Sequence, residues 1–239
     1  MAKLTNNLSV FLPTYNESEN IKSVVLHTKD VLQDVVDNWE IIVVNDGSSD
    51  NTKAVVEALS KDDKRIRVIN HEKNLGYGSS LRTGFYNSKY SWISFIDSDG
   101  QFDFSEISRF IEKQKETNSD VVIGYYTKRR VSKFKIITSK MWEFAVWFLF
   151  GLKVRDIDCG FKMISKKVID KIPKLESERG AFISSEFLIK AKQSGFNIQE
   201  VPVTHYPRIR GEGTGRNLNV IIKSFVDLLR LYRDLKKSA

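Results

Sequence analysis

Short hydrophobic runs alternate along this chain with stretches of helical periodicity. The runs at 8–12 and 40–44 are stopped by Pro13 and by the polar group that begins at Asn45, which is typical of buried strands. Between them, the positions that recur at helical spacing are Ile21, Val24, Val25, Thr28, Leu32 and Val35. The opening of the chain therefore predicts a strand, a helix and a second strand.

The same alternation continues through the first half of the chain. It predicts further strands at 65–69, 92–96 and 120–124, with helices at 80–90 and 104–117. Strands that alternate with helices imply right-handed crossovers and a mainly parallel sheet covered on both faces. The predicted fold class is therefore α/β.

Polar segments follow three of these strands, at 13–17, 45–50 and 97–101. Sheets of this kind bind ligands in the crevice beyond the carboxyl ends of their strands. We therefore expect the three segments, although distant in sequence, to converge on one site.

The second half of the chain is less regular. After Gly124 the alternation weakens, and we expect a basic, then aromatic, then loop-rich stretch to about residue 216. A C-terminal amphipathic helix is predicted over 217–239. It is expected to pack onto the domain, with membrane or subunit contact as the alternative. Its apolar stripe consists of Leu218, Ile221, Ile222, Phe225, Leu229, Tyr232 and Leu235.

The chain has 239 residues, of which 41% are hydrophobic, enough for a single globular domain over 1–239 with a substantial core. The only cysteine, Cys159, excludes an internal disulfide framework. The histidines, His27, His71 and His205, lie too far apart to indicate a zinc cluster. The N-terminus reaches a proline after a very short apolar run, so we expect no signal peptide there and predict a cytoplasmic location.

Basic residues outnumber acidic ones, which gives a net charge of +8 and a pI near 9.4. This charge favours polyanionic partners such as nucleic acid, an anionic membrane or a phosphorylated substrate. A solvated face is the alternative for each basic cluster. One cluster contains Lys128, Arg129, Arg130, Lys133, Lys135 and Lys140, and the other interleaves Arg208, Arg210 and Arg216 with glycines.

An aromatic stretch at 141–152 follows the first basic cluster. It is about a dozen residues long and contains Glu143, whereas a membrane-spanning helix needs about 20 residues. It therefore does not cross a bilayer by itself. Bulky aromatics beside a basic run resemble a segment that lies in a membrane interface, and a buried core helix is the equal alternative.

The strongest chemical signal follows the strand predicted at 92–96. Asp97 and Asp99 are separated by one residue and are followed by the side-chain amide of Gln101. These are hard oxygen ligands of the kind that Mg²⁺ or Mn²⁺ prefers. A nucleotide diphosphate would complete the shell of such an ion, which would act as a Lewis acid as a sugar bond breaks.

Two further polar motifs end strands or open helices. Asp46 leaves its strand where a base or ribose could present N–H or O–H donors, and Gly47 permits a tight turn. Ser49 or Asp50 could cap the following helix. The motif at 74–78 places glycines where they could either cradle phosphate or supply positive φ angles.

These motifs, in this order and spacing, resemble glycosyltransferase family 2. They are Pro13-Thr-Tyr15-Asn16-Glu17, Asn45-Asp46-Gly47-Ser48-Ser49-Asp50-Asn51-Thr52, Asn74-Leu-Gly76-Tyr-Gly78 and Asp97-Ser-Asp99-Gly-Gln101. Later segments resemble the dolichyl-phosphate (polyprenyl-phosphate) mannosyltransferase branch, namely Asp156-Ile-Asp-Cys-Gly160-Phe161-Lys162, Ser185-Glu186, and Glu200-Val-Pro202-Val with Arg208 and Gly211. The resemblance implies a GT-A fold, a Rossmann-like transferase fold, with a nucleotide-sugar-binding half at 1–124 and an acceptor-binding half at 125–216.

The resemblance also implies roles for individual residues. Asp97, Asp99 and Gln101 would meet the metal, Mg²⁺ or Mn²⁺, and the diphosphate. The residues that would hold the nucleoside are Pro13, Tyr15, Glu17 and Asp46.

At the acceptor end, the resemblance implies that Lys135 and Ser139 bind the acceptor phosphate and that Arg208 bridges the acceptor and donor phosphates. The chain departs from the branch at 124–126, where it reads Gly-Tyr-Tyr instead of Gly-Ser followed by arginine. Either a residue of the following basic cluster (Lys128, Arg129 or Arg130) substitutes for that arginine, or the acceptor differs.

Physical chemistry favours a phosphate acceptor independently. A hydroxyl nucleophile needs a general base, for which Asp156 and Glu186 are the candidates, and both could equally be structural. A phosphate monoester is already anionic near neutral pH and needs only cations to orient it. The fixed fork of an arginine suits phosphate, which favours Arg208.

The sequence therefore predicts a metal-dependent inverting transferase that moves a hexose, mannose from GDP-mannose being favoured, onto a polyprenyl (dolichyl) phosphate. It would work as a peripheral protein on the cytoplasmic face of a membrane, with an oligomer or a membrane-anchoring subunit left open. The nearest alternatives use UDP-glucose or UDP-N-acetylglucosamine, or act on a saccharide hydroxyl. A nucleotide-sugar sensor and a nucleic-acid-binding domain are the non-enzymatic alternatives, and the latter leaves Asp97 and Asp99 unexplained.

Overall fold

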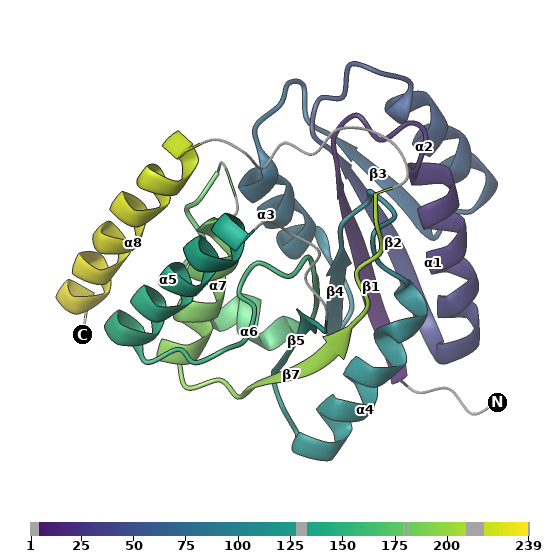
Figure 1. The fold of residues 1–239 in the computed structure, drawn as a ribbon. Helices are drawn as coiled ribbons and strands as arrows, with labels where there is room; N and C mark the ends of the chain where they lie inside the picture. The colour runs from purple at the N-terminus through teal and green to yellow at the C-terminus, as the bar shows by residue number, and fades with distance from the viewer. Residues whose placement is uncertain (1–4, 128–132, 179, 181, 209–217, 239) are drawn as a thin grey trace.

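A computed structural model of the chain describes residues 5–127, 133–178, 180, 182–208 and 218–238, without the side chains of 5–6, 133–137, 218–223 and 237–238. Within these residues, seven strands form one sheet in the order β3-β2-β1-β4-β6-β5-β7 (Figure 1). Only β6 runs antiparallel to its neighbours. The strands are β1 (Thr5–Thr14), β2 (Val36–Asn45), β3 (Ile66–Asn70), β4 (Trp92–Ile96), β5 (Val121–Tyr126), β6 (Phe161–Ser165) and β7 (Ile198–Val203).

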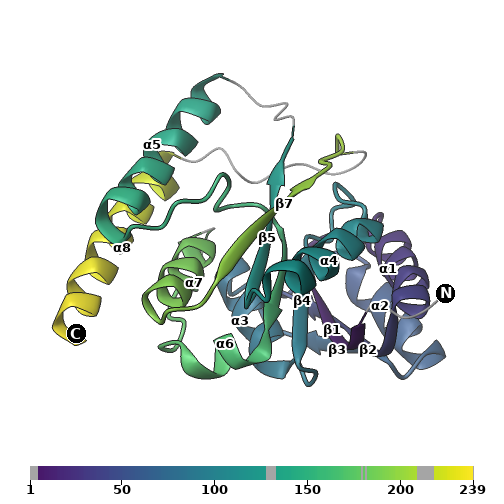
Figure 2. The same ribbon diagram turned by 90° about the horizontal axis from the view of Figure 1, so that it is seen from below.

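Helices cover both faces of this sheet (Figures 1 and 2). One face carries α1 (Ile21–Val35), α2 (Thr52–Asp62) and α4 (Ile107–Thr117), the last preceded by the 3₁₀ turn η1 (Phe104–Glu106). The other carries α3 (Tyr77–Asn87), α6 (Lys166–Lys171) and α7 (Phe182–Gln193). Two long helices, α5 (Lys133–Phe150) and α8 (Leu218–Ser238), form a further layer outside α7.

Alternate side chains of each strand enter two separate cores. In β1, Phe11 faces the core beneath α3, where its ring lies 5.0 Å from that of Phe85 and 5.3 Å from that of Phe95. Val10 and Leu12 face the core beneath α1. Because successive strand side chains point to opposite faces and both faces are covered, the strand reads as a continuous apolar run rather than an alternating one.

The predicted α/β class and the strands predicted in the first half are confirmed. The helix predicted at 80–90 begins earlier, at Tyr77, because Gly76 makes the preceding turn with a φ of 99°. The expected convergence of polar segments also holds, because β1, β2 and β4 are parallel neighbours whose carboxyl ends meet at one edge.

The expectation of a loop-rich stretch after Gly124 is wrong, since β6, α6, α7 and β7 all lie there. The sequences of these elements show no clear hydrophobic periodicity. Lys162 interrupts β6 although its side chain is fully buried, and α7 is buried along most of its length, including Glu186 and Lys190. A helix buried all round shows no amphipathic stripe. The boundaries at 124 and 216 remain predictions, but β6 lies between β4 and β5 in the same sheet.

The outer helices pack on the domain with one face and leave another uncovered. Trp142 of α5 meets Phe225 of α8 edge to face at 5.1 Å, and Phe150 meets Tyr232 at 5.6 Å. The predicted stripe of α8 therefore packs inward in part. Leu229 is an exception, because it is 55% exposed.

The aromatic stretch of α5 is buried along one face and exposed along the other, and its role at a membrane interface remains a prediction. Val146 and Phe150 are buried in the core, as in a core helix. The opposite face leaves large apolar side chains exposed, namely Met141, Phe144, Trp147 and Phe148. Among the described helices, none is both long enough and apolar enough to span a membrane.

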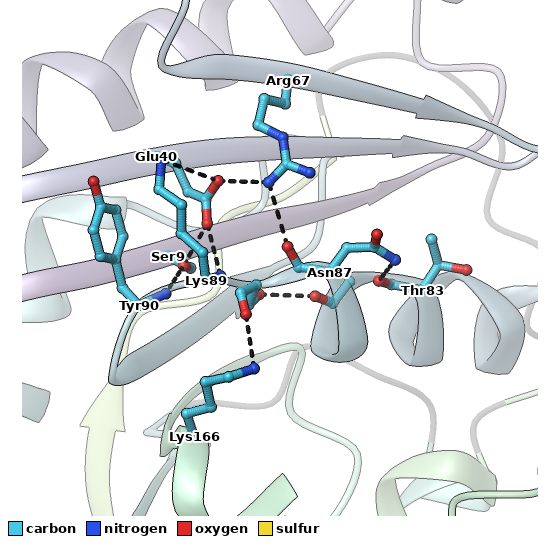
Figure 3. A network of polar contacts seen from close by, with 10 residues as sticks. Ser9, Glu40, Arg67, Thr83, Asn87, Lys89, Tyr90 and Lys166 are labelled. Carbon is cyan, nitrogen blue, oxygen red and sulfur yellow. Dashed lines mark hydrogen bonds and ion pairs between the residues drawn. The ribbon is translucent and has the colours of Figure 1, made fainter. Parts of the chain in front are cut away.

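A polar network lies where the connection from α3 to β4 meets β1 and β2 (Figure 3). The fully buried Glu40 accepts hydrogen bonds from Ser9 Oγ at 2.7 Å and from Lys89 N–H at 3.0 Å. Its other oxygen lies 2.7 Å from Arg67 Nη1. Burial by itself raises the pKa of Glu40, but these donors outweigh burial and hold the pKa below its ordinary value. The charge of Glu40 is thus compensated within the chain.

Candidate functional site

The loops that follow β1 and β2 are joined by hydrogen bonds. Asn16, in the left-handed region with a φ of 54°, donates its N–H to Ser48 Oγ at 2.9 Å and accepts from Ser49 N–H at 2.8 Å. Asp50 accepts from the N–H of Thr52, the first residue of α2, at 2.9 Å, although the N-cap position itself is Asn51, which makes no side-chain capping bond. These loops therefore form one rigid wall of the site.

The loop after β4 joins the same wall. Ser98 is buried and donates its hydroxyl to the carbonyl of Pro13 at 2.9 Å. Ser98 is the residue between Asp97 and Asp99, so this bond fixes the acidic pair beside the end of β1. All three polar segments predicted to converge do so.

Asp97 is the most perturbed acid of the site. Burial, followed by the negative charge of Asp99, raises the pKa of Asp97 to about 7. The hydroxyl of Tyr77 donates to Asp97 Oδ1 at 2.9 Å and opposes this shift without cancelling it. Burial and the charge of Asp97 also raise the pKa of Tyr77 well above its ordinary value, so this hydroxyl keeps its proton.

Arg208 reaches the acidic pair from the segment after β7. One guanidinium nitrogen forms an ion pair with Glu17, and the other lies 3.6 Å from Asp99 Oδ2. Burial raises the pKa of Glu17 despite its bonds to Asn20 and Arg208. Two carboxylates that follow different strands therefore share one guanidinium group, and contact between Arg208 and phosphates remains a prediction.

Gln101 fastens the segment that carries Arg208. Its side-chain amide donates to the carbonyl of Tyr206 at 2.9 Å, and its backbone carbonyl accepts from Tyr206 N–H at 2.8 Å. The amide of Gln101 therefore has a structural partner, and contact between Gln101 and a metal remains a prediction.

Asp46 is occupied by groups of the chain itself. Its carboxylate accepts hydrogen bonds from Leu75 N–H at 2.9 Å and Gly76 N–H at 2.8 Å, and it lies 2.6 Å from His71 Nδ1. The two N–H groups that could have cradled phosphate are therefore directed at Asp46. The positive φ of Gly76 supports the alternative interpretation of this motif as a turn. Contact between Asp46 and a nucleoside remains a prediction.

The remaining donor-side residues lie at the same edge. Tyr15 is 44% exposed and is free to stack against a ligand, while Pro13 is buried and contributes its carbonyl to Ser98. Contact between these two residues and a nucleoside remains a prediction.

The predicted acceptor residues are more scattered. Ser139 lies on α5, and Lys135 belongs to the same helix, but the side chain of Lys135 lies outside the described residues. Asp156 is buried and accepts from Asp158 N–H at 3.2 Å. The basic residues proposed to replace the missing arginine, 128–130, also lie outside the described residues.

Glu186 has a structural environment. Its carboxylate accepts from Glu176 N–H at 2.8 Å and Ser177 N–H at 2.9 Å, and it pairs with Lys190 at 2.6 Å. These bonds outweigh the effect of burial and hold the pKa of Glu186 below its ordinary value, which is unfavourable for a general base. Of the two interpretations left open by the sequence, the structure supports the structural one.

The acidic pair suits a divalent cation in charge and ligand type. The carboxylates of Asp97 and Asp99 are oxygen ligands at the end of one strand, and burial, together with the negative charges of Asp99 and Glu17, raises the pKa of Asp97. Among the described residues, no group of three or more His, Cys, Asp and Glu side chains is arranged to hold an ion. Oxygens from a bound diphosphate would therefore have to complete the shell around Asp97 and Asp99.

Sequence reasoning missed two neighbours of Asp97. Tyr77 donates to one carboxylate oxygen, and a Cβ placed on Gly160 would lie only 2.1 Å from the other. The signals available in the sequence were the position of Tyr77 between two glycines and the position of Gly160 directly before β6. Neither signal reveals its partner, because the contacts join residues 20 and 63 positions apart in sequence.

Known proteins similar to this chain identify its family. The model of Glycosyl transferase family 2 matches residues 9–173. The dolichyl-phosphate beta-glucosyltransferase of Saccharomyces cerevisiae is 29% identical, over 96% of this chain and 78% of that protein. Dolichyl-phosphate beta-glucosyltransferase ALG5A of Trichomonas vaginalis is also 29% identical, over 94% of this chain and 72% of that protein. Glycosyltransferase AglD of Haloferax volcanii is 27% identical, but the chain spans only 33% of its length.

Solved structures add the fold. Glucosyl-3-phosphoglycerate synthase from Mycobacterium tuberculosis, in complex with Mn²⁺, UDP and phosphoglyceric acid, superposes with a TM-score of 0.71. The match covers 95% of this chain and 78% of that chain at 19% identity. The same protein in complex with Mg²⁺ and UDP gives a TM-score of 0.70. At this identity the likeness shows the fold, which is GT-A.

The family match covers more than half of the chain, and the sheet brings the motifs of that match to one edge. The chain therefore belongs to glycosyl transferase family 2 and is a glycosyltransferase.

Proposed function

We propose that this glycosyltransferase moves a hexose from a nucleotide diphosphate sugar to the phosphate of a polyprenyl lipid. The observation that carries the proposal is the acidic pair Asp97 and Asp99 with Arg208 directed at it, at the carboxyl edge of the sheet. The names of two relatives support the acceptor, since both are dolichyl-phosphate glucosyltransferases that this chain matches over most of its length.

The donor we propose is UDP-glucose. The branch resemblance favoured mannose from GDP-mannose, but the two relatives carry glucose in their names. The structural neighbour binds UDP, and it was solved with UDP-glucose as well. GDP-mannose therefore becomes the competing donor, which the same experiment tests.

Asp97 and Asp99 would hold Mg²⁺ or Mn²⁺, as the complexes of the structural neighbour suggest. The ion would supply Lewis-acid neutralisation of the diphosphate as the anomeric C–O bond breaks. Ser98 and Tyr77 hold the acidic pair in place through their hydrogen bonds. Asp99 also draws Arg208 toward the position where donor and acceptor phosphates would meet.

The acceptor chemistry requires no general base. A phosphate oxygen of the lipid attacks the anomeric carbon while the bond to the nucleoside diphosphate breaks, so a single displacement inverts the configuration. The phosphate is already anionic, and Arg208 would orient it beside the donor. The structural engagement of Glu186 fits this scheme, because no carboxylate is needed to remove a proton.

We further propose that α5 and α8 rest on the membrane that holds the lipid. The uncovered face of α5 presents Phe144, Trp147 and Phe148, and α8 adds Val226 and Leu229. Apolar side chains on a basic protein favour insertion into the interface of an anionic bilayer.

Replacing Phe144 and Phe148 by serine should weaken sedimentation with anionic vesicles while metal-dependent donor binding is kept. Unchanged sedimentation would contradict this surface. The cytoplasmic location remains a prediction.

The decisive experiment measures release of nucleoside diphosphate in detergent from UDP-glucose, UDP-N-acetylglucosamine and GDP-mannose. Each donor is tested with Mn²⁺ or Mg²⁺, with and without a polyprenyl phosphate, beside Asp99→Asn. We expect turnover with UDP-glucose that depends on the lipid and is lost in the variant. Metal-dependent donor binding without lipid-dependent turnover would contradict the lipid acceptor and favour a saccharide acceptor or a sensor.

A further inference from the structure

The Asp97 carboxylate is confined from two sides by residues outside the acidic pair. Tyr77 donates its hydroxyl to Oδ1 at 2.9 Å. On the other side, Gly160 lies so close that an added Cβ would come within 2.1 Å of Oδ2 and 2.5 Å of Cγ. The N–H of Asp97 also donates to the carbonyl of Gly160 at 3.2 Å. The carboxylate therefore has little freedom to turn.

The backbone of Tyr77 is itself held from the side of β2. Leu75 and Gly76, the two residues before it, both donate their N–H groups to the buried Asp46. Asp46 in turn lies against His71, whose other ring nitrogen lies 2.9 Å from Thr83 Oγ1 on α3. The turn that precedes Tyr77 is thus stabilised by two charge-assisted hydrogen bonds to Asp46.

The backbone after Tyr77 is held from the opposite side. Ser79 N–H donates to the carbonyl of Glu178 at 2.9 Å, and Gly78 packs so tightly that an added Cβ would lie 2.6 Å from the carbonyl of Ser177. Glu186 holds this neighbouring segment by accepting from the N–H groups of Glu176 and Ser177. A packing role alone does not require a hydroxyl, yet this framework directs the hydroxyl of Tyr77 at a carboxylate.

We propose that Tyr77 is a positioning residue whose hydrogen bond sets the orientation in which Asp97 meets the divalent cation. The inference rests on the proposed function, because it assumes a metal bound with the donor diphosphate. It assigns Asp46 and Glu186, predicted to contact donor and acceptor, a shared task of holding the start of α3. A hydrogen bond to a charged acceptor is worth enough that its loss should weaken metal binding by about tenfold.

The test compares Tyr77→Phe with Tyr90→Phe, a matched removal of one hydroxyl near the Glu40 network, away from the acidic pair. Electron paramagnetic resonance of free Mn²⁺ gives the metal affinity in the presence of UDP or GDP, and titration calorimetry gives the nucleotide affinity without metal. For Tyr77→Phe we expect Mn²⁺ affinity to fall about tenfold, with metal-free nucleotide affinity within error of wild type. The variant should stay folded at the assay temperature, although the loss of a hydrogen bond to a buried carboxylate lowers its melting temperature. Turnover should fall at low Mn²⁺ and recover at high Mn²⁺.

Two results for Tyr77→Phe would overturn the inference. Folded Tyr77→Phe that binds Mn²⁺ as tightly as wild type would show that the hydroxyl does not position the carboxylate. An equal loss of metal-free nucleotide binding would indicate a general structural role. Wild-type protein without any metal-dependent nucleotide binding would contradict the proposed function itself. This result distinguishes a failure of the proposed function from a failure of the inference about Tyr77. Gly160→Ala, which crowds the same carboxylate from the other side, gives a second test: unchanged Mn²⁺ affinity in that folded variant would also overturn the inference.

Discussion

Glu40 and Asp97 are two acids of one sheet in opposite electrostatic surroundings. Around Glu40, the chain supplies Arg67, Lys89 and Ser9 as partners, and the pKa falls below its ordinary value. Around Asp97, burial and the charge of Asp99 prevail, and the pKa rises to about 7. A carboxylate compensated within the chain stabilises the fold, whereas one left beside like charges creates a demand for a cation from outside.

The largest effect should come from removing one of the two charges of the acidic pair. Asp99→Asn keeps the shape of the side chain but removes a metal ligand, so turnover should fall roughly 10³-fold, about 4 kcal/mol of transition-state stabilisation. Relief of repulsion with Asp97 should offset the lost ion pair with Arg208 and leave the urea unfolding midpoint equal or higher. Turnover and urea unfolding of the same preparation check both parts. A lower midpoint would show that Asp99, like Glu40, stabilises the fold.

A smaller loss of turnover should follow from displacing Asp97 without changing a charge. In Gly160→Ala, the new methyl group would come within 2.1 Å of Asp97 Oδ2, so the carboxylate must move. A misplacement of about 1 Å costs roughly 10²-fold in turnover. Steady-state kinetics at saturating donor measures the loss. As a control, Gly195→Ala replaces a glycine whose added Cβ meets nothing within 4 Å, and turnover should be retained there despite local strain at its positive φ.

The Glu40 network should respond in stability instead of turnover. Glu40→Gln removes the negative charge that pairs with Arg67 and accepts a hydrogen bond from the Lys89 N–H. We expect the free energy of unfolding to fall by about 2–3 kcal/mol, and the loss is limited because Arg67 stays partly solvated. Urea unfolding followed by circular dichroism measures it. Turnover per folded molecule should stay within about twofold of wild type. A selective loss of turnover would show that the two regions are coupled.

Acid should remove the same contribution from the wild-type protein. The folded pKa of Glu40 is lowered, so its charge stabilises the fold above the ordinary pKa of 4.5, and this contribution is lost as pH falls through the folded pKa. The stability difference between wild type and Glu40→Gln should therefore be constant at neutral pH and shrink as the pH falls below 4.5. Urea unfolding at a series of pH values reports the difference. A gap that is independent of pH would assign the effect to packing.

The smallest effect should come from the outermost partner in the Glu40 network. Lys89 Nζ lies 3.8 Å from Glu40 Oε2 and the Lys89 side chain is 52% exposed, so Lys89→Ala should cost less than about 1 kcal/mol. Its backbone N–H, which donates to Glu40, is unchanged by this substitution. Urea unfolding at low and high salt measures the cost, which salt should reduce further. A loss as large as that of Glu40→Gln would contradict this division of roles.

The donor end of the site could be predicted because each motif stands directly after an apolar run. Asp97 and Asp99 follow β4, and parallel strands carry such residues to a common edge. The acceptor end could not be predicted in the same way. Elements such as β6 and α7 contain buried Lys162 and Lys190, whose charges hide the apolar pattern on which the prediction depends.

The sequence by itself determined the fold class, the family resemblance and the convergence of acidic motifs, since hydrophobic periodicity and the order of motifs along the chain are properties of the sequence. Only the tertiary structure decided which carboxylates remain available for ligands. In the folded chain, Asp46 accepts hydrogen bonds from the turn before Tyr77, and Glu186 accepts them from the segment beside Gly78. Asp97 instead lies buried beside the negative charge of Asp99. The physical reason is that charge compensation depends on hydrogen-bond donors brought from distant positions, which no local pattern of residues records.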